Sequence, residues 1–134
     1  MILDQVPPAP LAPDCRVTPA SYEGVAVFHV QGELVAGSAG VLRAELAEAM
    51  GASRVLLEVS GVTWIDSVGL GALVGALRNI HEAGGQVAVA AARTPVGTLL
   101  RSAGIDRLAV VAESAEAALR SLVSPDPLVH SVPA

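Results

Sequence analysis

The residues best suited to chemistry in this sequence are Asp66 and Ser67, which directly precede a segment with helical periodicity. A carboxylate or hydroxyl at the N-terminal end of a helix accepts hydrogen bonds from first-turn amides that otherwise lack partners. Such a helix end also favours negative charge, so it suits an anion or a phosphate group. Ser67 and Thr63 carry the hydroxyls here that a kinase could modify, and the sequence leaves open whether either one takes a phosphate.

Enzyme and metal signatures are absent from the sequence. We find no Ser-His-Asp grouping, no His-Glu metal spacing, no P-loop and no dinucleotide-binding glycine pattern. Gly69 and Gly71 are not followed by a phosphate-binding lysine, and the lone Cys15 excludes an internal disulfide and a cysteine-based metal cluster. His29 is interpreted as a partly buried histidine with a local hydrogen bond. We therefore expect a protein that is not an enzyme, with no catalytic residue, metal or cofactor.

The composition indicates one domain with an aliphatic core. Hydrophobic residues make up 52% of the 134 residues but aromatic residues only 2%, so Val, Leu, Ile and Ala must fill the core. The formal net charge of -5 argues against a nucleic-acid partner, which favours a basic face. No signal peptide is recognised, and no apolar run reaches the roughly 18 residues that a spanning helix needs. We expect a cytoplasmic domain with no membrane insertion.

The elements around Asp66 are a strand before it and a helix after it. Residues 55–59 form an apolar run typical of a buried strand, Ser60-Gly61 interrupts it, and residues 62–65 give a second short extended piece. The apolar period then becomes helical, with one face formed by Leu70, Leu73, Val74 and Leu77. The helix glycines at 69, 71 and 75 are interpreted as allowing close approach to a neighbouring backbone.

The remaining elements follow from periodicity and from capping or turn residues. Before the central strand we expect an edge strand at 15–18, a turn at 19–24, a strand at 25–31 and a helix capped by Ser38 and ending near Met50. After the central helix we expect a strand at 86–91 and a helix from Thr94-Pro95 with Val96, Leu99, Leu100 and Ala103 on one face. A strand at 105–111 and a helix from Ser114 to about Leu122 complete the predicted fold. The order β-β-α-β-α-β-α-β-α predicts an α/β fold with mainly parallel pairing and an antiparallel first hairpin. Residues 1–14 and 124–134, rich in proline, are expected to be flexible tails; a Pro-rich recognition segment is the alternative for 1–14.

Residues 62–73, VTWIDSVGLGAL, resemble the signature of the STAS domain family, which includes bacterial anti-sigma factor antagonists and domains of sulphate transporters. In that family an apolar strand leads into a loop reading Asp-Ser-Ser/Thr-Gly-Leu-Gly and then into an apolar-faced helix. Gly-Glu-Leu at residues 32–34 is a second similarity. The resemblance covers residues 15–123 and implies a STAS-type mixed, mainly parallel sheet of four to five strands with about four helices.

Two positions depart from the family pattern. In the family's switch members the second hydroxyl residue after the aspartate is phosphorylated by a partner kinase that is also the anti-sigma factor. That position is Val68 here, which cannot be phosphorylated. Val35 likewise replaces an aspartate of the kinase-facing surface. Ser67 is a substitute acceptor only if the kinase tolerates a one-residue shift, which rotates the hydroxyl by about 100° on a helix.

The resemblance implies a serine kinase of the anti-sigma class as partner and, through it, release of a sigma factor by partner switching. We expect the chain to be an anti-sigma factor antagonist-like module, monomeric or weakly homodimeric, that binds without the usual phosphorylation switch. The expected contact residues are Leu34, Val35, Ser38, Asp66, Ser67, Val68, Gly69 and Leu70.

Other interpretations stay open at this point. Val68 can instead pack against Val35 or Trp64 on a surface that has lost its switching role, and Trp64 itself fits a contact or a core position. The module can also be a non-enzymatic scaffold or accessory subunit of a stressosome-like or transport complex. A nucleotide or anion sensor at the helix N-terminus is a third function, which the missing phosphate lysine and the few aromatic residues disfavour.

Overall fold

The computed structural model describes residues 15–91 and 94–123, so both expected tails lie outside the described residues. In chain order the elements are β1 (Cys15–Tyr22), β2 (Val25–Leu34), α2 (Ala39–Ala47), β3 (Arg54–Ile65), α3 (Ser67–Glu82), β4 (Gln86–Ala90), α4 (Pro95–Ser102), the short 3-10 helix η2 (Ile105–Arg107), β5 (Val110–Ala112) and α5 (Ala115–Val123). This order confirms the predicted alternation of strands and helices.

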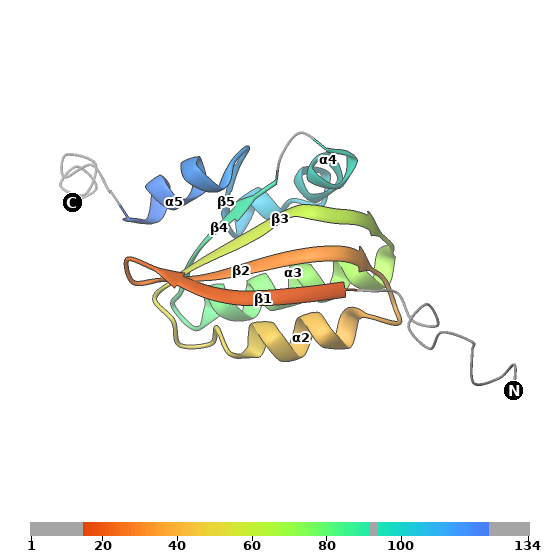
Figure 1. The fold of residues 1–134 in the computed structure, drawn as a ribbon, viewed down its shortest axis with the longest axis horizontal. Helices are drawn as coiled ribbons and strands as arrows, with labels where there is room; N and C mark the ends of the chain where they lie inside the picture. Colours follow the sequence, from red (N-terminus) through yellow and green to blue (C-terminus); the bar gives the residue numbers. More distant parts are fainter. Residues whose placement is uncertain (1–14, 92–93, 124–134) are drawn as a thin grey trace, which may run out of the picture.

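The strands form one five-stranded sheet in the order β1-β2-β3-β4-β5 (Figure 1). β1 pairs antiparallel with β2, and every other neighbouring pair is parallel. The predicted α/β fold with a mainly parallel sheet is therefore confirmed. Because right-handed crossovers advance in one direction across the sheet, α2, α3 and α4 lie on one face. α5 follows the last strand and packs on the other face.

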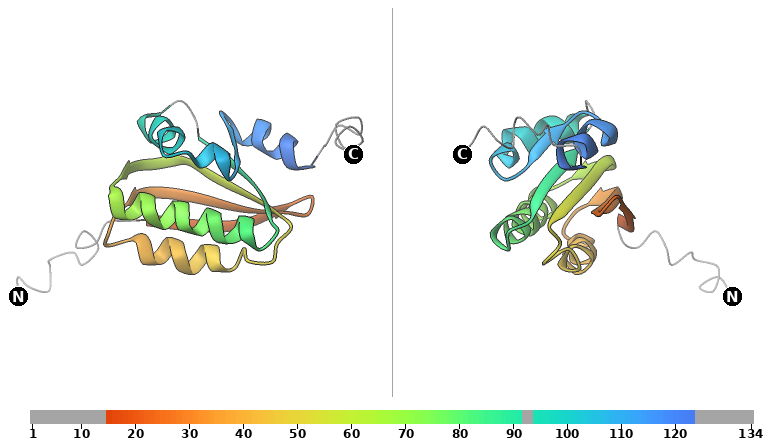
Figure 2. Two further views of the ribbon diagram at one scale, coloured as in Figure 1. Left: turned by 180° about the vertical axis from the view of Figure 1, so that it is seen from behind. Right: turned by 90° about the vertical axis from the view of Figure 1, so that its left-hand side faces the viewer.

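Both faces of the central strands β3 and β4 are buried, because their core residues alternate between two clusters on opposite sides of the sheet. Leu57 of β3 and Val89 of β4 belong to the large cluster that includes Leu42, Leu73 and Leu100 of α2, α3 and α4. The intervening residues, among them Leu56 and Ala88, pack with Ala118 and Leu122 of α5. Figure 2 shows α2 and α3 side by side along their face of the sheet, with α5 on the opposite side.

β1 and the first hairpin differ from the prediction. The strand continues through Pro19 to Tyr22, and the turn is confined to Glu23 and Gly24, which have φ values of 51° and 82°. Proline lacks the amide hydrogen that a central strand needs, but an edge strand has one unpaired side. β1 is such an edge strand, so Pro19 does not end it.

β3 is one continuous strand of 12 residues, so the expected break at Ser60-Gly61 is wrong. The pairing with β2 shifts register twice: His29 lies opposite Glu58 but Gln31 opposite Gly61, and Glu33 then lies opposite Trp64. β3 thus accommodates its extra residues as bulges, which keep the strand paired while it bends. As a result, β3 ends beside the end of β2.

Other corrections concern exposure and boundaries. α2 ends at Ala47 rather than near Met50, which lies in the following turn and is 49% exposed. Leu99 is 38% exposed, because the buried face of α4 is centred on Val96 and Leu100. His29 is exposed, since α5 covers Val25 and Val27 on its face of the sheet but not the next position along β2.

The last expected strand is also shorter than predicted. Residues 105–107 form η2, which buries Ile105, and the strand is limited to Val110–Ala112. Gly104, with a φ of 80°, directs the chain into this turn after α4. The predicted helix starts at Thr94 and Ser114 are confirmed, because their hydroxyls accept hydrogen bonds from the amides of Gly97 and Ala117.

The glycines of α3 fall into two classes. A Cβ atom on Gly69 would lie 2.0 Å from the carbonyl oxygen of Leu34, so close backbone approach requires this glycine. A Cβ on Gly71 or Gly75 would meet nothing within 4 Å. The close-approach interpretation is therefore confirmed for Gly69 and wrong for Gly71 and Gly75. The buried face of α3 is likewise centred on Leu73, Leu77 and Ile80, with Leu70 and Val74 only partly buried.

We predict that Gly75→Ala stabilises the domain by up to about 1 kcal/mol, the helix-propensity difference between the two residues. Gly69→Ala is the matched variant in the same helix and is expected to destabilise it, because the new methyl group collides with Leu34. Urea unfolding followed by circular dichroism measures both free energies. A stabilising Gly69→Ala variant would contradict the close contact.

Candidate functional site

The ends of β2 and β3 meet at one edge of the sheet and place the two predicted segments side by side. The backbone amide of Asp66 donates to the carbonyl oxygen of Leu34 at 3.2 Å. The Leu34 side chain is fully buried in the large core cluster. Residues 34–38 and 66–70, distant in sequence, therefore form one continuous structure, which we call the β2–α3 surface.

The Asp66 carboxylate joins the two halves of this surface. One oxygen, Oδ1, accepts from the Gly69 amide at 2.8 Å, which is the predicted cap of α3. The other, Oδ2, accepts from the Ala36 amide at 3.2 Å. The α3 cap and the loop after β2 thus depend on the same side chain.

These hydrogen bonds lower the pKa of Asp66 from its ordinary value of 3.8. The donating amide of Gly69 is the main cause, the amides of Ala36 and Val68 act in the same direction, and desolvation opposes them. Hydrogen bonds to the charged form of a carboxyl group stabilise that form. Asp66 is therefore ionised at neutral pH, as the cap requires.

Ser38 stabilises the loop after β2 rather than the helix it precedes. It occupies the N-cap position of α2 but makes no side-chain capping bond, so that expectation is wrong. Its hydroxyl donates to the Glu33 carbonyl oxygen at 2.6 Å and accepts from the Val35 amide at 3.0 Å. Ser38 is buried, with 2% exposed, and its hydroxyl links the backbone at the two ends of the turn between Glu33 and Val35.

The exposed part of the surface begins in the last residues of β3 and continues into the first turn of α3. Val68 is 45% exposed and Trp64 is 61% exposed, so neither is a core residue. Ser67 and Thr63 are also exposed, and the Thr63 hydroxyl donates to the Gly32 carbonyl oxygen at 3.3 Å. Val68, at the position where the sequence resemblance implies a hydroxyl residue in the family's switch members, is thus accessible.

The structure brings the predicted contact residues together but divides them by burial. Leu34, Ser38 and Gly69 are buried and support the surface from beneath. The residues that remain at least partly accessible are Val35, Asp66, Ser67, Val68 and Leu70. Sequence reasoning missed the Ala36 amide, because a backbone donor 30 residues away leaves no pattern in the sequence.

Within residues 15–91 and 94–123, no group of three or more His, Cys, Asp or Glu side chains is placed to hold a metal ion. None of the helices in the described part of the chain is long and apolar enough to cross a membrane.

A family model for the STAS domain matches residues 17–118. The chain belongs to the STAS domain family. The match contains both halves of the β2–α3 surface and most of the described fold, so the resemblance seen at residues 32–34 and 62–73 extends through the domain.

A curated relative of this STAS domain is the anti-sigma F factor antagonist of Paenibacillus polymyxa. The two are 27% identical over 104 residues, which are 75% of this chain and 89% of the relative. Among solved structures, an anti-sigma factor antagonist from Mycobacterium paratuberculosis is similar with a TM-score of 0.72 and 21% identity, over 81% of this chain and 94% of that one.

The antagonist SpoIIAA has the same fold in two states. Its unphosphorylated form matches with a TM-score of 0.62 and 17% identity, over 81% of this chain and 95% of that one. Its phosphorylated form matches with a TM-score of 0.60 and 19% identity, over 81% and 99%. These likenesses establish a shared fold.

We predict that the Asp66 cap stabilises the domain in a pH-dependent way. Because the pKa is lowered in the folded protein, the contribution of the charge is complete above the ordinary value of 3.8 and is lost as pH falls through the folded value. Asp66→Asn keeps a carbonyl acceptor without the charge, so it should lose this pH dependence. Asp66→Ala removes the cap and should be less stable than wild type at neutral pH.

Urea unfolding of the three proteins between pH 7 and pH 2.5 measures these differences. The stability gap between wild type and Asp66→Asn should narrow below pH 3.8. A gap that widens toward acid pH would contradict the direction of the pKa shift.

Proposed function

We propose that this STAS domain is an anti-sigma factor antagonist-like binding module. It captures a serine kinase of the anti-sigma class, so that a sigma factor is released, and it acts in the cytoplasm without catalysing a reaction. The accessible residues of the β2–α3 surface, Val35, Asp66, Ser67, Val68 and Leu70, make the contact. The observation that carries the proposal is the exposed Val68 at the acceptor position. It lies in the first turn of α3, which the Asp66 carboxylate connects to the loop after β2.

The geometry of this surface suits protein binding. The two hydrogen bonds of Asp66 and the contact of Gly69 with Leu34 hold both segments in place. A preorganised surface loses little conformational entropy when a partner binds. The exposed Val68 and Trp64 add apolar area, and tryptophan is enriched at the centres of protein interfaces.

Val68 also separates binding from control by phosphorylation. A phosphate at this position would add roughly -1.5 to -2 charges beside the Asp66 carboxylate. Valine has no hydroxyl to accept it, so the surface keeps the character of the unphosphorylated state. Ser67 does not replace it, because a one-residue shift turns the hydroxyl by about 100° around the helix.

The decisive measurement is native and intact-mass spectrometry of the full chain mixed with each anti-sigma serine kinase of the source genome and ATP. Wild type is expected to form a complex with one kinase and to gain no phosphate. Val68→Ser restores the hydroxyl and is expected to bind and to gain 1 phosphate at position 68, because the rest of the helix start is unchanged.

Two results would count against this function. If neither protein binds any kinase, the antagonist role is wrong, and assembly into large homo-oligomers would favour the scaffold role. If wild type is phosphorylated at Ser67 or Thr63, the switch is retained in another form. Ser67→Ala, which keeps Val68, identifies that site.

A second prediction tests the surface without ATP. Val68→Asp places a negative charge beside Asp66 and should weaken kinase binding by about tenfold or more, as unfavourable charge placement at an interface does. Val110→Asp is the matched control, because Val110 is 46% exposed and lies in β5 at the far edge of the sheet. Isothermal titration calorimetry measures the kinase affinity of both variants. Equal affinities would show that Val68 is not part of the interface.

A further inference from the structure

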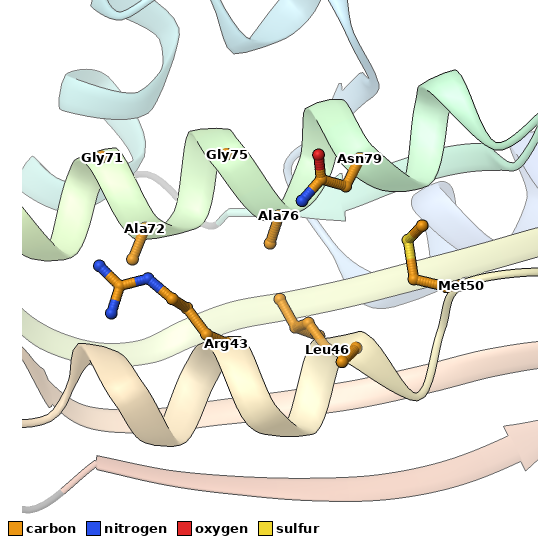
Figure 3. A pocket seen from close by; sticks show the side chains of 9 residues that line it. Arg43, Leu46, Met50, Gly71, Ala72, Gly75, Ala76 and Asn79 are labelled. Atoms are coloured by element: carbon orange, nitrogen blue, oxygen red, sulfur yellow. The ribbon is translucent and has the colours of Figure 1, made fainter.

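A groove lies between α2 and α3, behind the β2–α3 surface, and has a volume of about 280 Å³. Its nine lining residues come from α2, the turn after it and α3, and include Arg43, Leu46, Met50, Gly71, Gly75 and Asn79. Figure 3 shows Arg43 reaching from α2, and Met50 from the turn after α2, toward α3, where Asn79 lies. The groove is lined mainly by apolar side chains and glycines, and Arg43 and Asn79 supply its polar side chains.

Packing within the domain does not explain the glycines of this groove. Gly71 and Gly75 lie inside a regular helix, where glycine is less favourable than alanine. A Cβ on either would meet nothing within 4 Å, in contrast to Gly69. The two glycines therefore leave space open on the outer side of α3, one helical turn apart.

The groove is continuous with the exposed acceptor position. Val68, Ala72, Gly75 and Asn79 are spaced by four, three and four residues, which places them along one face of α3. The face therefore leads from the exposed Val68 into the groove. A partner that contacts Val68 meets the groove next along the helix.

Charge and shape specify the occupant. Arg43 is the charged residue among the nine that line the groove, and it is exposed. Its guanidinium group favours a carboxylate on the partner. Met50, 49% exposed, is flexible and adapts to the apolar surface of a partner. Glycines one turn apart let another helix approach α3 closely, with its side-chain ridge between α2 and α3.

We propose that the α2–α3 groove is a second contact site for the same partner. An amphipathic helix of the anti-sigma kinase lies in it, with small or aliphatic side chains over Gly71 and Gly75 and an acidic side chain on Arg43. This inference rests on the proposed function and adds a second element to its interface. The kinase is thereby held by α3 from its first turn to Asn79.

The test measures binding of the full chain to the kinase that forms a complex with wild type, by calorimetry. Gly75→Leu fills the groove with a better helix former and is expected to weaken binding by about tenfold or more, the size of a central interface contact. Arg43→Glu should weaken it through charge repulsion, while Arg43→Lys keeps most of the affinity. Thr98→Leu, on the exposed side of α4, controls for an added leucine.

Hydrogen exchange on the same complex locates the contact on both proteins. Protection is expected at residues 43–50 and 71–79 of this chain and in one helical segment of the kinase that carries an acidic residue. Unchanged affinity of Gly75→Leu and Arg43→Glu, with protection limited to residues 34–38 and 66–70, would overturn the groove but leave the proposed function standing. A wild-type chain that binds no kinase would overturn both the groove and the proposed function. Protection in a non-helical kinase segment would overturn the groove alone.

Discussion

The structure depends on the close approach of α3 to the end of β2. The absence of a side chain on Gly69 lets the helix backbone reach the Leu34 carbonyl, and the Asp66 carboxylate bonds an amide on each side of the junction. Each interaction supports the other, because the carboxylate reaches Ala36 only when the two segments touch. A protein interior tolerates few voids or overlaps, so this junction fixes where the first turn of α3 stands.

The same junction explains how the recognition surface varies while the fold is kept. Leu34, Ser38 and Gly69 are buried at the junction, whereas Ser67 and Val68 are exposed. The side chain at position 68 can therefore change what the surface presents without disturbing the packing beneath it. This separation is compatible with membership of the STAS family, because the packing at the junction does not depend on the residue at position 68.

α3 serves different purposes on its different sides. Leu73, Leu77 and Ile80 fill the core, and Gly69 makes the junction with β2. The outward side, with Gly71 and Gly75, contributes nothing to packing inside the domain and keeps a groove open beside α2. Glycines at open positions lower the intrinsic stability of a helix, and such local costs are expected at functional sites. This is the reason that the groove is proposed as part of the binding surface.

The sequence by itself determined the features that depend on near neighbours. Strand and helix periods gave the order of elements, and the caps at Asp66, Thr94 and Ser114 were found because each hydroxyl or carboxylate bonds an amide three residues on. Ser38 has the same chemistry but no cap, since the Glu33 carbonyl and the Val35 amide hold its hydroxyl. The tertiary structure decided this difference, and it also decided that Gly69 is packed while Gly75 is open and that β3 continues through Gly61. Each of these outcomes depends on a loop, helix or strand remote in the chain, and local periodicity contains no information about such contacts.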